Sequence, residues 1–144
     1  MSSPAAAAIF AAHVVTGADT DAPTLLGAWC AACEAWSFPW TPNCRRCDGP
    51  NEQRSAGSRG TLYSLTTVRS KPPLGFPQPY SLAYIDLDDA PLRVLMPVAP
   101  AAGAQAGTPA TIGTRVRLTV VPLGHDAAGQ PCLRPLFQTE PAKA

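Results

Sequence analysis

Charge is scarce in this sequence, and the little that is present is balanced. Only 15% of the 144 residues are charged, and 11 Lys and Arg against 10 Asp and Glu leave a formal net charge of +1. Proteins that bind nucleic acid or other polyanions usually carry a strong basic excess. The composition therefore argues against nucleic acid as the main partner.

The groups that most often perform acid–base or nucleophilic catalysis are also few. The chain has two histidines: His13 falls in an expected N-terminal helix and His125 in an expected turn, where solvated or capping roles fit best. Cys132 is expected to be a small buried strand residue, because a nucleophile would need a neighbouring base and only His125 is near in sequence. No phosphate-binding or hydrolase motif occurs. The acidic run at 86–89 reads as a solvated turn, so no catalytic set is predicted.

The sequence has no long hydrophobic run, and its first residues are not expected to be a secretion signal. The N-terminal stretch MSSPAAAAIFAAHVV is apolar but too short to cross a bilayer, and no basic residues precede it. We therefore expect a cytoplasmic protein with no membrane contact. A reducing compartment disfavours structural disulfides. The 17 prolines and 11 glycines leave little room for long helices, apart from a helical segment expected within 1–24.

Four of the five cysteines lie in two C-x-x-C pairs within WCAACEAWSFPWTPNCRRCDG, namely Cys30, Cys33, Cys44 and Cys47. Two such knuckles face to face form a closed four-thiolate site of the kind that holds structural zinc. Iron uses similar ligands and stays an alternative, as does a disulfide pairing. A thioredoxin-like redox motif would need a βαβ unit that the sequence does not show. A closed site has no open position for substrate, so we expect it to stabilise rather than catalyse.

Aromatic residues crowd the same segment. Trp29, Trp36, Phe38 and Trp40 all fall between residues 29 and 40. They are expected mainly to form the small core that a zinc ribbon otherwise lacks. The alternative is that they present an aromatic surface to a partner, because Trp is enriched among interface anchors.

The chain beyond residue 57 has β character. Five strands are expected at 60–70, 80–89, 90–98, 113–123 and 131–139. In the fourth, Val116, Leu118 and Val120 alternate with polar residues, as in a strand with one buried face. Five such strands suit a small Greek-key barrel of the oligonucleotide/oligosaccharide-binding (OB) type. We therefore predict a mainly β protein: a zinc ribbon at 25–56, an OB barrel at 57–140 and a short tail at 141–144.

The loops of the expected barrel differ in character. KPPLGFPQPY, between the first two strands, is rich in proline and aromatic residues and lies where OB barrels often carry binding residues. The Ala/Gly/Pro-rich stretch 100–110 is expected to be a flexible loop rather than a helix. The stretch GHDAAGQ is expected to be a hairpin turn.

The order of a four-cysteine ribbon followed by GTLYSLTTVR, YSLAYIDLDD, IGTRVRL and LRPLF resembles the OB-fold, acyl-CoA-associated family catalogued as domain of unknown function 35. The likeness runs from about residue 25 to 137. Glu34 and Arg45 depart from the family's usual knuckle residues but leave the metal ligands intact. Family members often accompany thiolase-fold enzymes that act on CoA thioesters, the accessory subunit of benzoylsuccinyl-CoA thiolase among them.

The resemblance implies a non-catalytic zinc-binding subunit of a hetero-oligomer, with a thiolase-fold partner that handles the acyl-CoA substrate. On this interpretation, the residues expected to contact the partner or acyl-CoA lie in the ribbon and in the first barrel loop: Trp36, Phe38, Trp40, Arg69, Lys71, Phe76 and Tyr80. Two alternatives remain, a stand-alone acyl-CoA-binding protein and, less favoured, a module that stacks single-stranded nucleic acid on aromatic rings.

Overall fold

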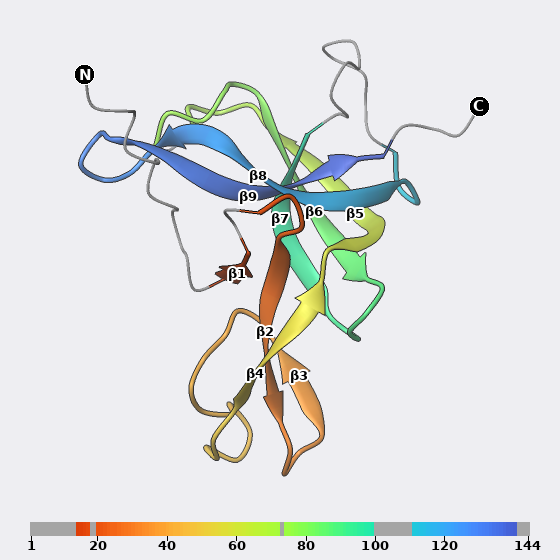
Figure 1. Ribbon diagram of the computed structural model, residues 1–144. Coiled ribbons are helices and arrows are strands. Elements are labelled where there is room, and N and C mark those ends of the chain that lie inside the picture. Colours follow the sequence, from red (N-terminus) through yellow and green to blue (C-terminus); the bar gives the residue numbers. More distant parts are fainter. Residues whose placement is uncertain (1–13, 18–19, 73, 100–110, 141–144) are drawn as a thin grey trace.

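The chain forms two β structures joined end to end (Figure 1). The computed structural model describes residues 14–17, 20–72, 74–99 and 111–140. Nine strands occur in these residues, and the mainly β class predicted from the sequence is confirmed. No helix in the described part is long and apolar enough to span a membrane. The N-terminal helical segment was predicted within 1–24; residues 1–13 of it lie outside the described residues, as does the predicted loop at 100–110. Its described part is not the predicted helix, because Val15–Thr16 form strand β1 and Thr24 begins β2, so the prediction is wrong there.

The first structure is a small sheet, which we call the ribbon. Its strands are β1 (Val15–Thr16), β2 (Thr24–Cys30), β3 (Ala35–Ser37) and β4 (Glu52–Gly57). Strand β2 pairs antiparallel with each of the other three. Its sequence TLLGAWC is the most apolar of the four, which fits a strand covered on both sides. Strand β4, with the sequence EQRSAG, exposes its first four residues.

The second structure is a closed five-stranded barrel, with strands in the order β5-β6-β7-β9-β8. Its strands are β5 (Arg59–Val68), β6 (Tyr80–Leu87), β7 (Arg93–Ala99), β8 (Arg115–His125) and β9 (Pro131–Thr139). All neighbours pair antiparallel except β7 and β9, whose short contact is parallel. The five predicted strands are thus confirmed. The third barrel strand, β7, was expected to begin at residue 90 but begins at Arg93. A turn precedes it, closed by the Leu87 N–H donating to the Leu92 carbonyl.

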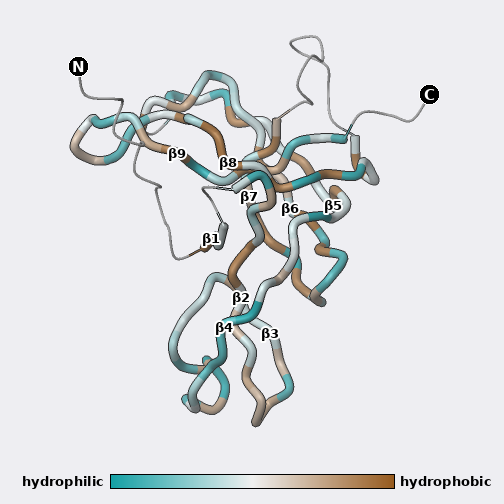
Figure 2. Tube along the Cα trace, in the orientation of Figure 1, coloured by the Kyte–Doolittle hydropathy of each residue, from teal (hydrophilic) through white to brown (hydrophobic). Residues whose placement is uncertain are grey.

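One hydrophobic core runs through both structures. Val116 and Leu118 point inward from β8 and are buried, while Arg115 and Arg117 are exposed, as the alternation predicted. Phe137 of β9 is fully buried in the same core. The ribbon contributes Val15, Leu25 and Ala56. Figure 2 shows hydrophobic residues following β2 and hydrophilic residues along β4. Because the core is shared, the ribbon is packed against the barrel rather than tethered to it.

Gly60 lies where β5 and β6 approach most closely. A Cβ at this position would collide with the backbone carbonyl oxygen of Asp86 and would lie 2.7 Å from Ile85 Cγ2. Because the nearest obstacle is a backbone atom rather than a flexible side chain, the strands could not adjust at low cost. Glycine at the start of β5 therefore permits the barrel to close beside the ribbon junction.

An ion pair joins the turn after β6 to the start of β8. The two terminal guanidinium nitrogens of Arg115 donate to the two carboxylate oxygens of Asp88, and Arg115 Nη1 also donates to the hydroxyl of Thr61 on β5. Arg115 lowers the pKa of Asp88, chiefly through these hydrogen bonds. The contact therefore ties together the three segments that meet at this end of the barrel.

The Asp88 pair predicts a pH-dependent contribution to stability. The pKa of Asp88 is lower in the folded chain than in the unfolded chain. The ion pair therefore contributes fully to stability above about pH 4, and this contribution is lost as the pH falls through the pKa of the folded state. We expect Asp88→Asn to lower the free energy of unfolding by about 0.5 kcal/mol at pH 7, because the pair is exposed. Urea unfolding of both proteins should show this difference shrink as the pH is lowered below about 4. An equal loss at pH 3 would mean that Asp88 acts through packing instead.

Candidate metal centre

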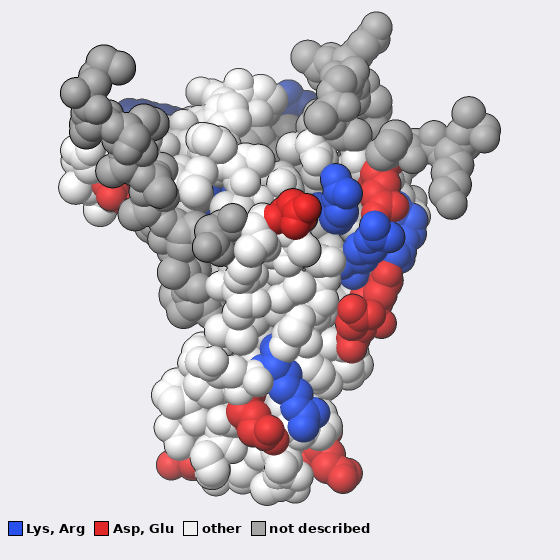
Figure 3. Space-filling view, viewed as in Figure 1, with Lys and Arg blue, Asp and Glu red and all other residues white. Residues whose placement is uncertain are grey.

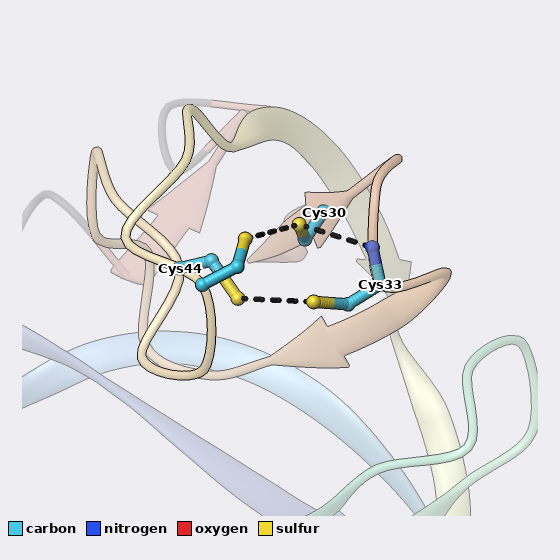
Figure 4. A group of neighbouring side chains, drawn as sticks. Cys30, Cys33 and Cys44 are labelled. Atoms are coloured by element: carbon cyan, nitrogen blue, oxygen red, sulfur yellow. Dashed lines mark hydrogen bonds between the residues drawn. The ribbon is translucent and has the colours of Figure 1, made fainter.

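The four clustered cysteines come from two turns at the tip of the ribbon. Cys30 ends β2 and Cys33 follows in the turn to β3, while Cys44 and Cys47 lie in the loop between β3 and β4. Figure 4 shows Cys30, Cys33 and Cys44 directing their sulfur atoms toward one another. All four Sγ atoms lie within 4.8 Å of one another. The structure therefore brings together the whole predicted ligand set.

The spacing of the sulfurs fits a tetrahedral metal. Cys30 Sγ lies 3.6 Å from Cys47 Sγ, and Cys44 Sγ lies 3.9 Å from Cys33 Sγ. Four sulfurs at about 2.3 Å from a central ion are about 3.8 Å apart in a tetrahedron. A disulfide would need about 2.05 Å, so the cysteines are free thiols, which disagrees with the disulfide alternative. The donor set fits a divalent cation bound by four thiolates.

Backbone amides face the sulfurs. The N–H of Cys33 donates to Cys30 Sγ at 3.4 Å, that of Arg46 to Cys44 Sγ at 3.3 Å, and that of Gly49 to Cys47 Sγ at 3.4 Å. Such donors partly neutralise the charge of a four-thiolate site and hold each sulfur in one direction. Each C-x-x-C turn thus supplies hydrogen bonds as well as ligands.

The second knuckle is held in shape by its own backbone. The N–H of Cys44 donates to the carbonyl of Gly49 at 2.8 Å, and the N–H of Asp48 donates to the carbonyl of Cys44 at 2.9 Å. Asp48 has φ near 60°, a left-handed conformation that Asp tolerates better than most residues. The side chain of Asn43 donates to the Asp48 carbonyl at 3.1 Å. These bonds close the loop so that Cys44 and Cys47 face the first knuckle.

Without a metal the thiols do not ionise alike. The pKa of Cys33 is raised to about 12, first by its hydrogen bond with Cys47 and then by burial. The pKa of Cys44 is lowered to about 6, because the backbone N–H groups of Cys47 and Arg46 donate to its sulfur. At neutral pH, Cys44 is therefore mostly a thiolate while Cys33 keeps its proton. A bound cation would stabilise the thiolate form of both and release the proton of Cys33.

The aromatic residues of the ribbon are half-buried, and Trp29, Trp36 and Phe38 have contacts within the chain. Trp29 and Trp36 meet edge to face, with ring centroids 5.7 Å apart, and the Arg54 guanidinium lies 4.7 Å from the centroid of the Trp29 ring. Trp36 and Phe38 pack against the shared core. These contacts favour the interpretation that the aromatics stabilise the ribbon. A partner contact by Trp36, Phe38 and Trp40 stays a prediction.

The first barrel loop lies against the end of the β8–β9 hairpin. Phe76 and Tyr80 meet edge to face with centroids 5.3 Å apart, and the N–H of His125 donates to the Leu74 carbonyl at 2.8 Å. Arg69 and Lys71 are exposed at the start of this loop. The structure thus brings Phe76 and Tyr80 together.

Arg134 was missed by the reasoning from sequence. It is 4% exposed, on β9 beneath the first loop, with its guanidinium carbon 5.0 Å from the centroid of the Phe76 ring. The guanidinium donates to the carbonyls of Leu123 and His125 and to the sulfur of Cys132. The sequence did contain a signal for its burial, because Arg134 shares its strand face with Cys132 and Leu136, which are both buried. Cys132 is buried as predicted, and its contact with Arg134 supports a structural role.

The geometry defines a class of protein: a four-cysteine ribbon packed onto an OB-type barrel. Residues 52–121, from β4 through most of β8, match the family model described as the ChsH2 C-terminal OB-fold domain. The chain is also similar to the solved structure of an Ltp2-ChsH2(DUF35) aldolase chain, with 24% identity and a TM-score of 0.58 over 81% of this chain and 84% of that chain. At this identity the likeness shows a shared fold. No curated protein matches the chain in sequence.

These two matches confirm the resemblance predicted from the sequence. The family model covers the barrel strands that carried three of the four sequence motifs, and the similar solved chain bears the DUF35 name in its own description.

The metal centre predicts which cysteines are needed for metal binding. We expect the wild-type chain to carry about one metal ion and Cys33→Ser to lose it on dialysis against EDTA, because three thiolates do not close the site. Cys132→Ser is the matched control and should keep its metal, since Cys132 lies in the barrel. Elemental analysis by mass spectrometry measures both. Metal retained by Cys33→Ser would place the site elsewhere.

The position of Arg134 predicts a loss of stability on its removal. Arg134→Met would leave the Leu123 and His125 carbonyls without this buried donor, at a cost of about 3 kcal/mol in the free energy of unfolding. Arg117→Met, at an exposed position of β8, is the control and should change the value by less than about 0.5 kcal/mol. Urea denaturation measures both variants. Equal effects would show that the hydrogen bonds of Arg134 do not matter for folding.

Proposed function

We propose that this chain is a non-catalytic subunit that binds structural zinc and supports a thiolase-like catalytic subunit acting on CoA thioesters. The observation that carries the proposal is the likeness to a ChsH2(DUF35) chain described with Ltp2 as an aldolase. Its fold match spans ribbon and barrel together rather than the barrel alone. The partner's reaction would be thiolytic cleavage, acyl transfer or retro-aldol cleavage. A cytoplasmic location is part of the proposal.

Zinc is the metal we propose for the four thiolates. The sulfur spacing and the closed set of four thiols are those of structural zinc sites, although iron takes the same ligands. Zinc needs no redox partner and would hold the two knuckles of the ribbon together. The chain's own residues supply the rest: amides that face the sulfurs, and aromatic rings that join the ribbon to the core.

A supporting role agrees with what the candidate catalytic residues do. Within the described residues, the His125 ring is bound by its Nδ1 to the Asp126 carbonyl and lies against the backbone of Gly75. Cys132 contacts a buried guanidinium. Asp86 and Asp88 are paired with arginines. These contacts give each group a structural partner, so the reaction is assigned to the partner subunit.

The charge on the barrel supports a protein partner over nucleic acid. Figure 3 shows basic and acidic side chains next to one another at one side of the barrel. Arg59, Arg93 and Arg115 form ion pairs with Glu140, Asp86 and Asp88, respectively. Binding to nucleic acid would instead need cations directed at phosphates. A stand-alone acyl-CoA-binding role remains the alternative, and the purified chain can test it.

The proposed function predicts a stoichiometric partner. We expect the tagged chain, purified from its own host, to bring down a thiolase-fold protein in near-equimolar amount, identified by mass spectrometry. The pair, but not the chain alone, should turn over acyl-CoA. Turnover by the chain alone would favour a stand-alone protein, and RNA in the purified sample, released by salt, would favour the nucleic-acid alternative.

A further inference from the structure

The large hydrophobic side chains that the fold leaves exposed are gathered mainly on one part of the barrel. In the described part of the chain these are Tyr63, Tyr84, Leu95 and Ile112, with 49%, 45%, 51% and 70% of their surface exposed. Tyr63, Tyr84 and Leu95 lie on the consecutive strands β5, β6 and β7. Single exposed apolar residues are ordinary, but a contiguous group marks an interaction site.

Strand register places these three residues in one row. Tyr84 pairs with Leu95 on one side and with Ser64 on the other, and Tyr63 occupies the β-bulge next to Ser64. The residues that flank Tyr84, Ala83 and Ile85, are buried in the barrel. Because side chains alternate along a strand, Tyr84 points to the outer face, and the same argument holds for Leu95 between Val94 and Met96. We call Tyr63, Tyr84 and Leu95 the barrel row.

The neighbouring row carries charges that cancel. Asp86 pairs with Arg93 across β6 and β7 and with Thr61 across β6 and β5. The Arg93 Nε donates to Asp86 at 2.7 Å, and its guanidinium carbon lies 3.3 Å from the centroid of the Tyr63 ring. The barrel row is therefore bordered by an ion pair of no net charge, which also fixes the Tyr63 ring. Apolar centres with polar rims are typical of protein–protein interfaces.

Three of the aromatic residues predicted to contact a partner already have contacts inside the chain. Trp36 and Phe38 pack against the core, and the Phe76 ring lies over the Arg134 guanidinium. Moving them to meet another protein would expose core surface or the buried guanidinium. The barrel row needs no such rearrangement, because its three side chains are exposed in the folded chain.

We propose that the barrel row is the surface on which the catalytic subunit docks, through an uncharged segment of apolar or aromatic side chains. Charge complementarity favours this partner. The ion pair beside the barrel row has no net charge, so it favours a neutral protein surface and offers no free cation to a polyanion. The Tyr63 ring, held by the Arg93 guanidinium, loses little freedom on binding, which suits it as an anchor. The inference rests on the proposed function and names the surface through which this chain would bind the catalytic subunit.

The test uses Leu95→Arg in the full-length chain. An arginine here would meet a neutral apolar surface unpaired, and we expect the dissociation constant of the complex with the thiolase-fold subunit to rise at least about 30-fold. Gln53→Arg is the matched control, since it adds the same charge at an exposed strand position on the ribbon. Tyr84→Ala is the second variant and should weaken binding by at least about tenfold without adding charge. Metal content and circular dichroism verify that each variant is folded.

The outcomes separate the inference from the proposed function. Selective loss of binding by Leu95→Arg and Tyr84→Ala supports both. If all variants bind the thiolase-fold subunit like wild type, the docking surface is wrong and the proposed function stands. If wild type itself binds no thiolase-fold subunit, the proposed function falls and takes the inference with it. If sedimentation shows wild type to be a dimer that Leu95→Arg makes monomeric, the row binds a second copy and the inference is overturned.

Discussion

The ribbon depends on four sulfur atoms meeting at one point. Strand β3 has three residues and the loop between β3 and β4 has little regular structure, so hydrogen bonds between strands could hold only part of this region. Cys30 and Cys33 are on one turn and Cys44 and Cys47 are on another, and a bound cation would join them. The amides that face the sulfurs are placed by the same turns. The two turns therefore determine both the positions of the sulfur ligands and the hydrogen bonds that those ligands accept.

Side-chain contacts connect the cysteine cluster at the tip of the ribbon to the core of the barrel. Trp36 follows the first knuckle and covers Gly27, whose absent side chain leaves room for the ring. Trp36 and Phe38 then reach the core that Leu25 and Ala56 share with the barrel strands. A metal ion held by the cysteines at the tip would therefore also stabilise the position of the ribbon relative to the barrel.

The barrel divides its residues between internal contacts and its outer surface. Arg134 and the first loop form a buried contact at one end, where the guanidinium satisfies two backbone carbonyls and supports the Phe76 ring. On the outer face of β5, β6 and β7, arginines and aspartates neutralise one another beside exposed tyrosines. Positive and negative charges are therefore balanced on this face of the barrel as well as over the whole sequence. A surface of this kind fits another protein better than a polyanion.

The sequence by itself determined the features that depend on near neighbours. Two residues between cysteines define each knuckle, and alternation in RVRLTV predicted the buried face of β8, because both follow from local backbone geometry. Only the tertiary structure decided that the Phe76 ring lies over the Arg134 guanidinium and that Tyr63, Tyr84 and Leu95 form one row. Those contacts join segments tens of residues apart, and strand register and a β-bulge, not local sequence, set which side chains meet.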